Sequence, residues 1–170
     1  MSFVYPGDEK DDFSFIFDLI REYYTAHEVV PKYAEDTNAV GKIEGVVAMS
    51  KTDYYPTFLD KATYLLIQIS QGHFFGNGNK RLALVTFLYF TITNFYRFRK
   101  YSKDEQKEKL RELFPEYGQF ADFDRFDATA FAYYNLSIII ADSKHYGVSF
   151  DDLKRRVKKF IDFSVEFERS

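Results

Sequence analysis

The sequence has no cysteine and no tryptophan, and only 4 of its 170 residues are proline and 8 are glycine. Without cysteine the chain can form no disulfide framework, no thiolate metal site and no thiol nucleophile. No stretch rich in Pro, Gly or Ser reads as a linker, and there is no internal repeat or low-complexity tract. Together with a length typical of one domain, these absences predict a single domain over residues 1–170.

An excess of basic charge and long apolar runs are absent as well. Lys+Arg 23 against Asp+Glu 26 gives a net charge of -3, so a nucleic-acid partner is not expected. The most apolar stretch, residues 82–96, is shorter than the ~20 residues that a membrane span needs. The first residues contain no basic stretch followed by an apolar run, as a secretory signal would. We therefore expect a cytoplasmic protein that does not bind a membrane.

The sequence is rich in aromatic residues and in helical periodicity. The 20 Phe and 14 Tyr predict a core filled with rings. Apolar residues recur at spacings of three and four, which indicates an all-α domain of six or seven helices. We predict these helices over residues 11–27, 37–50, 57–71, 82–95, 102–114, 124–143 and from 149 onward. Residues 82–95 are apolar nearly all round, which is typical of a central buried helix, and residues 51–56 are predicted as a loop or a short β-hairpin.

Residues 73–81, with the sequence His-Phe-Phe-Gly-Asn-Gly-Asn-Lys-Arg, lead into the predicted central helix. Gly76 and Gly78 free the backbone there. A loop of this kind turns N–H groups outward at a helix N-terminus and forms an anion site. Lys80 and Arg81 oppose the helix dipole in the first turn, and their placement is explained if an anion lies between them.

A phosphate chain suits such a site, and His73 at its rim is a candidate general base. The alternative is an ordinary helix–loop–helix turn with a surface histidine. The chemistry of the loop alone leaves both interpretations open.

The same nine residues resemble the signature loop of the Fic/Doc superfamily, His-x-Phe-x-Asp/Glu-Gly/Ala-Asn-Gly/Lys-Arg. Every defined position agrees except the acidic one, which is Asn77 in this sequence. The segments before the loop resemble the Doc (death-on-curing) branch at residues 41–48, Tyr55-Pro56, Lys61-Ala62 and Leu65-Leu66. The resemblance covers residues 41–95, and residues 96–170 are predicted as a helical extension of unknown role.

The resemblance implies a Fic/Doc-like helical bundle, with the short hairpin as a flap, that uses ATP as a substrate. In it, His73 would deprotonate a target hydroxyl, Arg81 would stabilise charge on the phosphates, and Phe75 would anchor the loop in the core. The residues implied to hold the phosphate oxygens are Gly76, Gly78, Asn79, Lys80 and Arg81.

Lys80 separates the branches of the family in this resemblance. Members that transfer AMP usually have glycine there, whereas Doc-type toxins have lysine and resemble kinases. A lysine side chain in the phosphate path excludes one nucleotide pose and supplies a cation for another. With His73 and Arg81 it completes the candidate catalytic set, for transfer of the terminal phosphate of ATP to a hydroxyl of a cytoplasmic protein. AMP transfer by the same site is the first alternative.

Asn77 replaces the acidic residue that holds Mg²⁺ in the family. An amide offers one neutral oxygen where Mg²⁺ favours a carboxylate, so we expect Mg²⁺ to bind more weakly and the activity to be low. A catalytically degenerate fold that only binds nucleotide or protein is the second alternative. The Doc branch further implies the toxin of a toxin–antitoxin pair, with a translation factor as a candidate substrate and an antitoxin protein as partner.

Overall fold

The computed structural model describes residues 2–8, 14–24, 32–76 and 78–168. These ranges contain seven α-helices, one short 3₁₀-helix and a two-stranded antiparallel sheet. The helices are α1 (Ser14–Tyr24), α2 (Thr37–Ser50), α3 (Phe58–Gln71), α4 (Asn79–Thr93), α5 (Lys103–Leu113), α6 (Ala128–Asp142) and α7 (Phe150–Ser164), and the 3₁₀-helix is η1 (Tyr33–Glu35). The predicted all-α class is confirmed.

Side-chain caps set where most of these helices begin. Thr57 and Ser102 each form a capping box, with Asp60 and Glu105 respectively, as S/T-x-x-D/E segments favour. The N-caps of α2, α6 and α7 are Asp36, Asp127 and Ser149. The helix α4 differs, because its N-cap is a glycine that offers no side chain to its first N–H groups.

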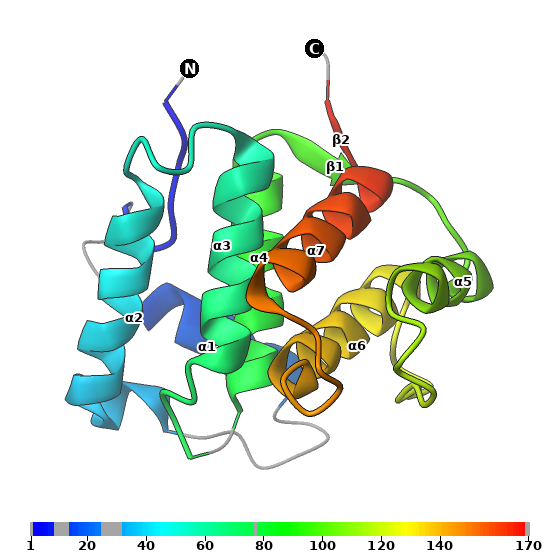
Figure 1. Cartoon of the computed structure of the whole chain (residues 1–170). Coiled ribbons are helices and arrows are strands. Elements are labelled where there is room, and N and C mark those ends of the chain that lie inside the picture. The colour runs from blue at the N-terminus through cyan, green and yellow to red at the C-terminus, as the bar shows by residue number, and fades with distance from the viewer. Residues whose placement is uncertain (1, 9–13, 25–31, 77, 169–170) are drawn as a thin grey trace.

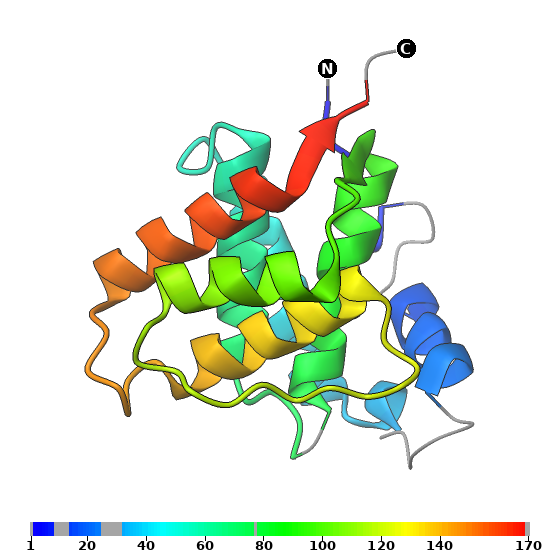
Figure 2. The same ribbon diagram turned by 90° about the vertical axis from the view of Figure 1, so that its right-hand side faces the viewer.

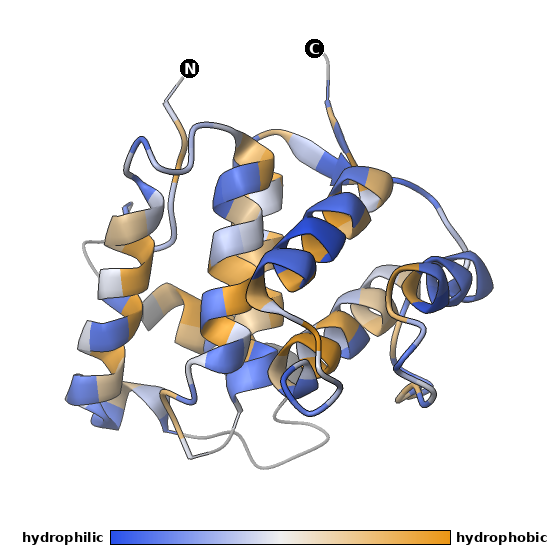
Figure 3. Cartoon of the chain, viewed as in Figure 1, coloured by the Kyte–Doolittle hydropathy of each residue, from blue (hydrophilic) through white to orange (hydrophobic). Residues whose placement is uncertain are grey.

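Helices α3 and α4 form the centre of the molecule, packed side by side along their length (Figure 1). Their apolar residues turn toward each other and toward α6 and α7, while α7 places its charged residues on the outside (Figure 3). The central position of α4 was predicted, but its last turns are not covered on every side. The side chain of Ile92 is 63% exposed and that of Leu88 is only half-buried.

Aromatic rings join the elements across the core. The ring of Phe87 on α4 stacks on that of Tyr133 on α6, with centroids 4.3 Å apart, and Phe58 on α3 stacks on Phe90 on α4 at 5.5 Å. The main cluster of buried side chains draws on all seven helices. Helices α5, α6 and α7 lie against one another beside the central pair (Figure 2). The described part of the predicted extension, residues 96–168, therefore contributes to the core.

The small β element lies elsewhere than residues 51–56. It consists of β1 (Tyr96–Phe98) and β2 (Val165–Phe167), which follow the ends of α4 and α7 and pair with Arg97 opposite Glu166. Residues 51–56 are turns, closed by bonds such as Tyr55 N–H to the Thr52 carbonyl at 3.2 Å. They also lie at the opposite end of α3 from the 72–78 loop (Figure 1). Because α3 has 14 residues, about 21 Å at 1.5 Å per residue, these turns cannot act as a flap over that loop.

Within the ranges described, no helix combines the length and the apolar character needed to cross a membrane.

Candidate functional site

A polar cavity of about 290 Å³ opens where the loop between α3 and α4 meets α6. Its walls are formed by Ser70, His73, Gly76, Gly78, Asn79, Lys80, Arg81, Tyr134 and Ala141. Six of the seven candidate residues predicted from the sequence therefore line one cavity. The seventh, Asn77, lies outside the described residues.

The end of α3 presents His73 at this cavity. Gly72 is the C-cap and has right-handed backbone angles, and the left-handed residue is His73 itself, with φ 45°. Gly72 is required by space, because a Cβ there would lie 2.3 Å from the ring of Phe74 and 2.7 Å from the carbonyl oxygen of Gln68. The chain can thus turn sharply and leave the imidazole exposed at the cavity.

Phe75 fastens the loop to the core. Its side chain is 7% exposed and meets the ring of Tyr33 edge-on, with centroids 4.7 Å apart, and that of Phe17 at 6.1 Å. Tyr33 and Phe17 in turn stack on each other at 5.1 Å. The ring therefore anchors the loop in the core, as the resemblance implies.

The amide group of Asn79 is used within the loop. Its Oδ1 accepts a hydrogen bond from the N–H of Phe75 at 3.0 Å, and its Nδ2 donates to the carbonyl of Phe75 at 2.7 Å. This pair of bonds closes the loop across four residues. The backbone N–H of Asn79, at the start of α4, can donate to an anion, and Nδ2 carries a second hydrogen that these two bonds do not use.

The first turn of α4 forms the floor of the cavity. Gly78 is left-handed, with φ 83°, and provides no side-chain cap, and the first bond of the helix runs from Leu82 N–H to the Gly78 carbonyl at 3.0 Å. The N–H groups of the first helical turn consequently have no acceptor within the helix. Lys80 is half-buried there, and Arg81 is 6% exposed. Two cations and the positive end of a helix dipole at one place favour an anionic ligand.

The described part of the lining does not suit a cation held by the protein. It has no carboxylate, and no group of three His, Asp or Glu side chains among the described residues could hold a metal ion. Mg²⁺ prefers carboxylate and phosphate oxygens. The donor set of the described lining therefore fits phosphate and does not fit a protein-bound metal.

Three residues of the lining were not predicted from the sequence. Tyr134 and Ala141 come from α6, and Ser70 is in the last turn of α3. The Ser70 hydroxyl is buried and has no hydrogen-bond partner. Tyr134 packs against Phe126, with ring centroids 5.1 Å apart. No spacing in the sequence connects α6 with residues 73–81. Ser70 lies three residues before His73, about one helical turn, and this spacing could have identified it as a neighbour of the site.

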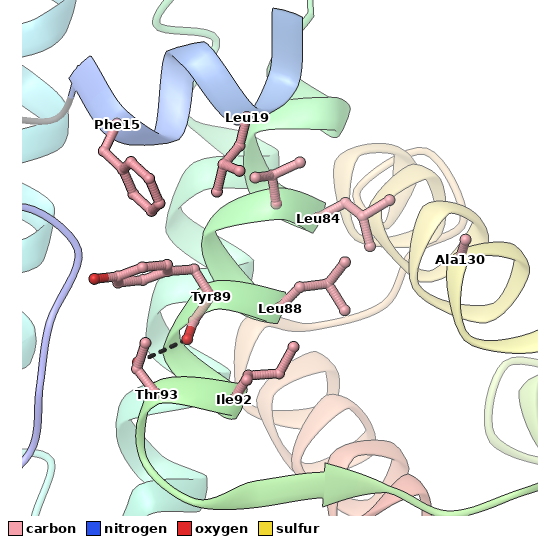
Figure 4. A pocket seen from close by; sticks show the side chains of 9 residues that line it. Phe15, Leu19, Leu84, Leu88, Tyr89, Ile92, Thr93 and Ala130 are labelled. Carbon is pink, nitrogen blue, oxygen red and sulfur yellow. Dashed lines mark hydrogen bonds between the residues drawn. The ribbon is translucent and has the colours of Figure 1, made fainter. Parts of the chain in front are cut away.

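A second hollow, of about 300 Å³, lies between α1, α4 and the start of α6 (Figure 4). Its lining is almost wholly apolar and consists of Phe15, Leu19, Leu84, Val85, Leu88, Tyr89, Ile92, Thr93 and Ala130. The Thr93 hydroxyl is directed back to the carbonyl of Tyr89, at 2.7 Å. None of the candidate residues lies in this hollow, which has no charged group for phosphate chemistry.

Residues 17–91 match the family model described as Fic/DOC family, which covers less than half of the chain. The match confirms the resemblance to the Fic/Doc superfamily and does not distinguish the Doc branch. It begins before residue 41, so the similarity includes most of α1 and all of η1 and α2. No curated protein and no solved structure matches the chain. The match supports the interpretation of this chain as a nucleotide-transferring protein of the transferase class.

Proposed function

We propose that this chain is a Fic/DOC-family enzyme that transfers the terminal phosphate of ATP to a hydroxyl group of another protein. The observation that carries this proposal is the cavity at the start of α4. There an exposed histidine, two cationic side chains and an uncapped helix N-terminus line the same space of about 290 Å³. A general base, charge stabilisation and phosphate binding are the three functions that phosphoryl transfer requires.

In the proposed complex, the phosphates of ATP lie over the first turn of α4. The backbone N–H groups that follow Gly78 and the side chains of Lys80 and Arg81 bind their oxygens. Gly76 also lines the cavity and has no side chain, so the phosphates can approach the loop closely there. The ammonium group of Lys80 favours a position of ATP in which the terminal phosphate is the one transferred, as the resemblance to the Doc branch implies.

The proposed reaction is a direct transfer. A ring nitrogen of His73 takes the proton of the target hydroxyl, and the hydroxyl oxygen forms a bond to the γ-phosphorus. The bond from that phosphorus to the β–γ bridging oxygen breaks, and ADP leaves with the electron pair. Lys80 and Arg81 stabilise the negative charge on the phosphate oxygens during the transfer. His73 then releases its proton to solvent.

No step of this reaction is assigned to Mg²⁺, because the described lining does not fit a metal bound by the protein. Mg²⁺ enters as the counter-ion of ATP. We expect Asn77→Asp to add a carboxylate that binds the metal, so that nucleotide binding and transfer both increase with Mg²⁺. No gain in either would contradict this assignment.

As a member of the Doc branch, the chain would act as the toxin of a toxin–antitoxin pair in the cytoplasm. Its substrate would be a cytoplasmic protein such as a translation factor, and an antitoxin protein would be its partner. These assignments rest on Lys80 and on the Doc-like residues before the loop.

The test uses the purified chain, a bacterial lysate and ATP labelled on either the α or the γ phosphate. We expect label on a protein band from γ-labelled ATP alone, and at least ~100-fold less label with His73→Ala, because general base catalysis contributes about that much. His145→Ala is the matched control, since His145 is also exposed but lies outside the cavity.

Label from α-labelled ATP would replace the kinase assignment with AMP transfer. No label from either form, also after Asn77→Asp, would contradict an enzymatic function. It would favour a binding module, an alternative that the lack of a carboxylate in the described lining keeps open. Titration of ATP with and without Mg²⁺ then shows whether the cavity binds nucleotide.

A further inference from the structure

The carbonyl of Gly78 accepts two hydrogen bonds from different elements. One comes from Leu82 N–H within α4, at 3.0 Å. The other comes from the hydroxyl of Tyr33 on η1, at 2.9 Å, and joins residues that are 45 positions apart in the sequence. The only side chain that fastens this carbonyl, among the bonds of the described residues, is that of Tyr33.

The direction of this carbonyl also determines the direction of a neighbouring N–H. The peptide group between Gly78 and Asn79 is planar and trans, so its N–H points opposite to its C=O. The carbonyl points along α4 toward Leu82, and the N–H of Asn79 therefore points out of the helix end. Both residues line the polar cavity. A bond that holds the carbonyl thus also holds an anion-binding donor in place.

Tyr33 is itself held rigidly. Tyr33 is only 2% exposed. Its ring stacks on that of Phe17, with centroids 5.1 Å apart, and meets that of Phe75 edge-on at 4.7 Å. Phe75 is bonded through its backbone to the amide of Asn79. The loop is therefore attached to one aromatic cluster at two points, by the Tyr33 hydroxyl at Gly78 and by Phe75 at Asn79.

From this geometry we infer that Tyr33 is a positioning residue of the phosphate site: its hydroxyl, acting through Gly78, sets the orientation of the first N–H groups of α4. The inference rests on the proposed function, because it requires that phosphate binds at this helix end. Gly78 has no side chain and a left-handed backbone, so without Tyr33 its peptide group is held only by the helix bond. Donors that are fixed in advance bind a ligand more tightly than donors that must be ordered on binding.

The test compares Tyr33→Phe with the unaltered chain. The substitution keeps the ring between Phe17 and Phe75 and removes only the hydroxyl. We expect the Kd for inorganic pyrophosphate, measured by calorimetry, and the KM for ATP to rise ~3- to 10-fold, as loss of one hydrogen bond predicts. We expect kcat to change less than ~2-fold, because the base and the cations remain.

The matched control is Tyr133→Phe, which also removes a buried tyrosine hydroxyl. That hydroxyl bonds the Ser164 hydroxyl between α6 and α7, and Tyr133 does not line the cavity. It should lower Tm and leave the Kd for pyrophosphate unchanged. Equal binding by Tyr33→Phe and the unaltered chain, or equal weakening by both variants, would overturn the role of Tyr33 alone. If the unaltered chain bound neither pyrophosphate nor ATP, the proposed function would fall and the role of Tyr33 with it.

Discussion

At the scale of single residues, a glycine near the 72–78 loop can be needed because a side chain would clash with neighbouring atoms, and not only because the backbone is left-handed. Gly72 and Gly76 illustrate the difference, because neither has a left-handed backbone. A Cβ on Gly72 would meet the ring of Phe74 and the carbonyl of Gln68, whereas a Cβ on Gly76 would have no atom within 4 Å. The two glycines therefore have different tolerances to substitution.

We predict that Gly72→Ala lowers the free energy of unfolding by about 1–3 kcal/mol, the range typical of overpacking. The ring of Phe74 has to move and the last turn of α3 has to shift, which also displaces the adjacent His73 and reduces transfer. Gly76→Ala is the control and should change stability by less than ~0.5 kcal/mol. Urea unfolding of both variants measures this, and equal stabilities would contradict the close contact at Gly72.

The two cations of the first turn belong to the same scale. Lys80 and Arg81 lie at the end of α4 where the dipole disfavours positive charge, and Arg81 is largely buried. The helix dipole makes this placement of positive charge unfavourable, and a bound anion would offset that effect. We therefore predict that saturating ATP or inorganic pyrophosphate raises the Tm of the chain, since a ligand that binds only the folded state stabilises it.

At the scale of elements, Asp60 joins two helices that are distant in the sequence. It completes the capping box of α3 with Thr57, and its Oδ1 accepts a hydrogen bond from Lys158 on α7 at 2.6 Å. Burial raises the pKa of Asp60, but the bonds from Lys158 and Thr57 outweigh this, and the net pKa is lowered. The ionised carboxylate is therefore favoured in the folded state.

We predict that Asp60→Asn lowers the free energy of unfolding at pH 7 by about 1–2 kcal/mol, through the weakened cap and the lost charge pair. Because the folded pKa is lowered, this carboxylate stabilises the fold fully above the unfolded pKa of about 4, and the contribution disappears as the pH falls through the folded pKa. The difference between the variant and the unaltered chain should thus shrink in acid. Urea unfolding at pH 7 and pH 3 tests this, with Lys158→Met to separate the pair from the cap. A difference that did not depend on pH would contradict it.

At the scale of the whole molecule, the matched region and the remainder share one core. The family match ends at residue 91, yet Tyr133 on α6 stacks on Phe87 of α4, and α7 packs against α3. The cavity is shared in the same way, since Tyr134 and Ala141 form one of its walls. The second half of the chain therefore completes both the core and the candidate site.

We predict that a fragment of residues 1–95 does not fold alone, whereas the whole chain unfolds in one cooperative transition. Removal of α6 and α7 would expose the buried faces of α3 and α4 to water. Circular dichroism and urea unfolding of both chains test this. A fragment with its own cooperative transition would show that the core divides near residue 95.

The features that the sequence predicted correctly are those that depend on residues close together along the chain. Apolar spacing and capping residues such as Thr57 and Ser102 act over a few positions, so the sequence predicted the starts of α2, α3, α5 and α7 to within one residue. Two starts were predicted less well, because α4 begins at Asn79 and not at residue 82, and α6 begins at Ala128 and not at residue 124. The β pair could not be predicted in this way, because β1 and β2 are about 70 residues apart and meet only where α4 and α7 end. The same holds for the hydrogen bond of Tyr33 to Gly78 and for the α6 wall of the cavity.

By itself the sequence determined the all-α class, the central helix and six residues that line one cavity, because each depends on neighbours along the chain or on a contiguous motif. Only the tertiary structure decided what surrounds that motif. There the Tyr33 hydroxyl donates to the Gly78 carbonyl, the side-chain amide of Asn79 bonds the backbone of Phe75, and α6 forms a wall of the cavity. The physical reason is that these contacts arise from the packing of amphipathic helices, which buries faces without recording in the local sequence which helix covers which.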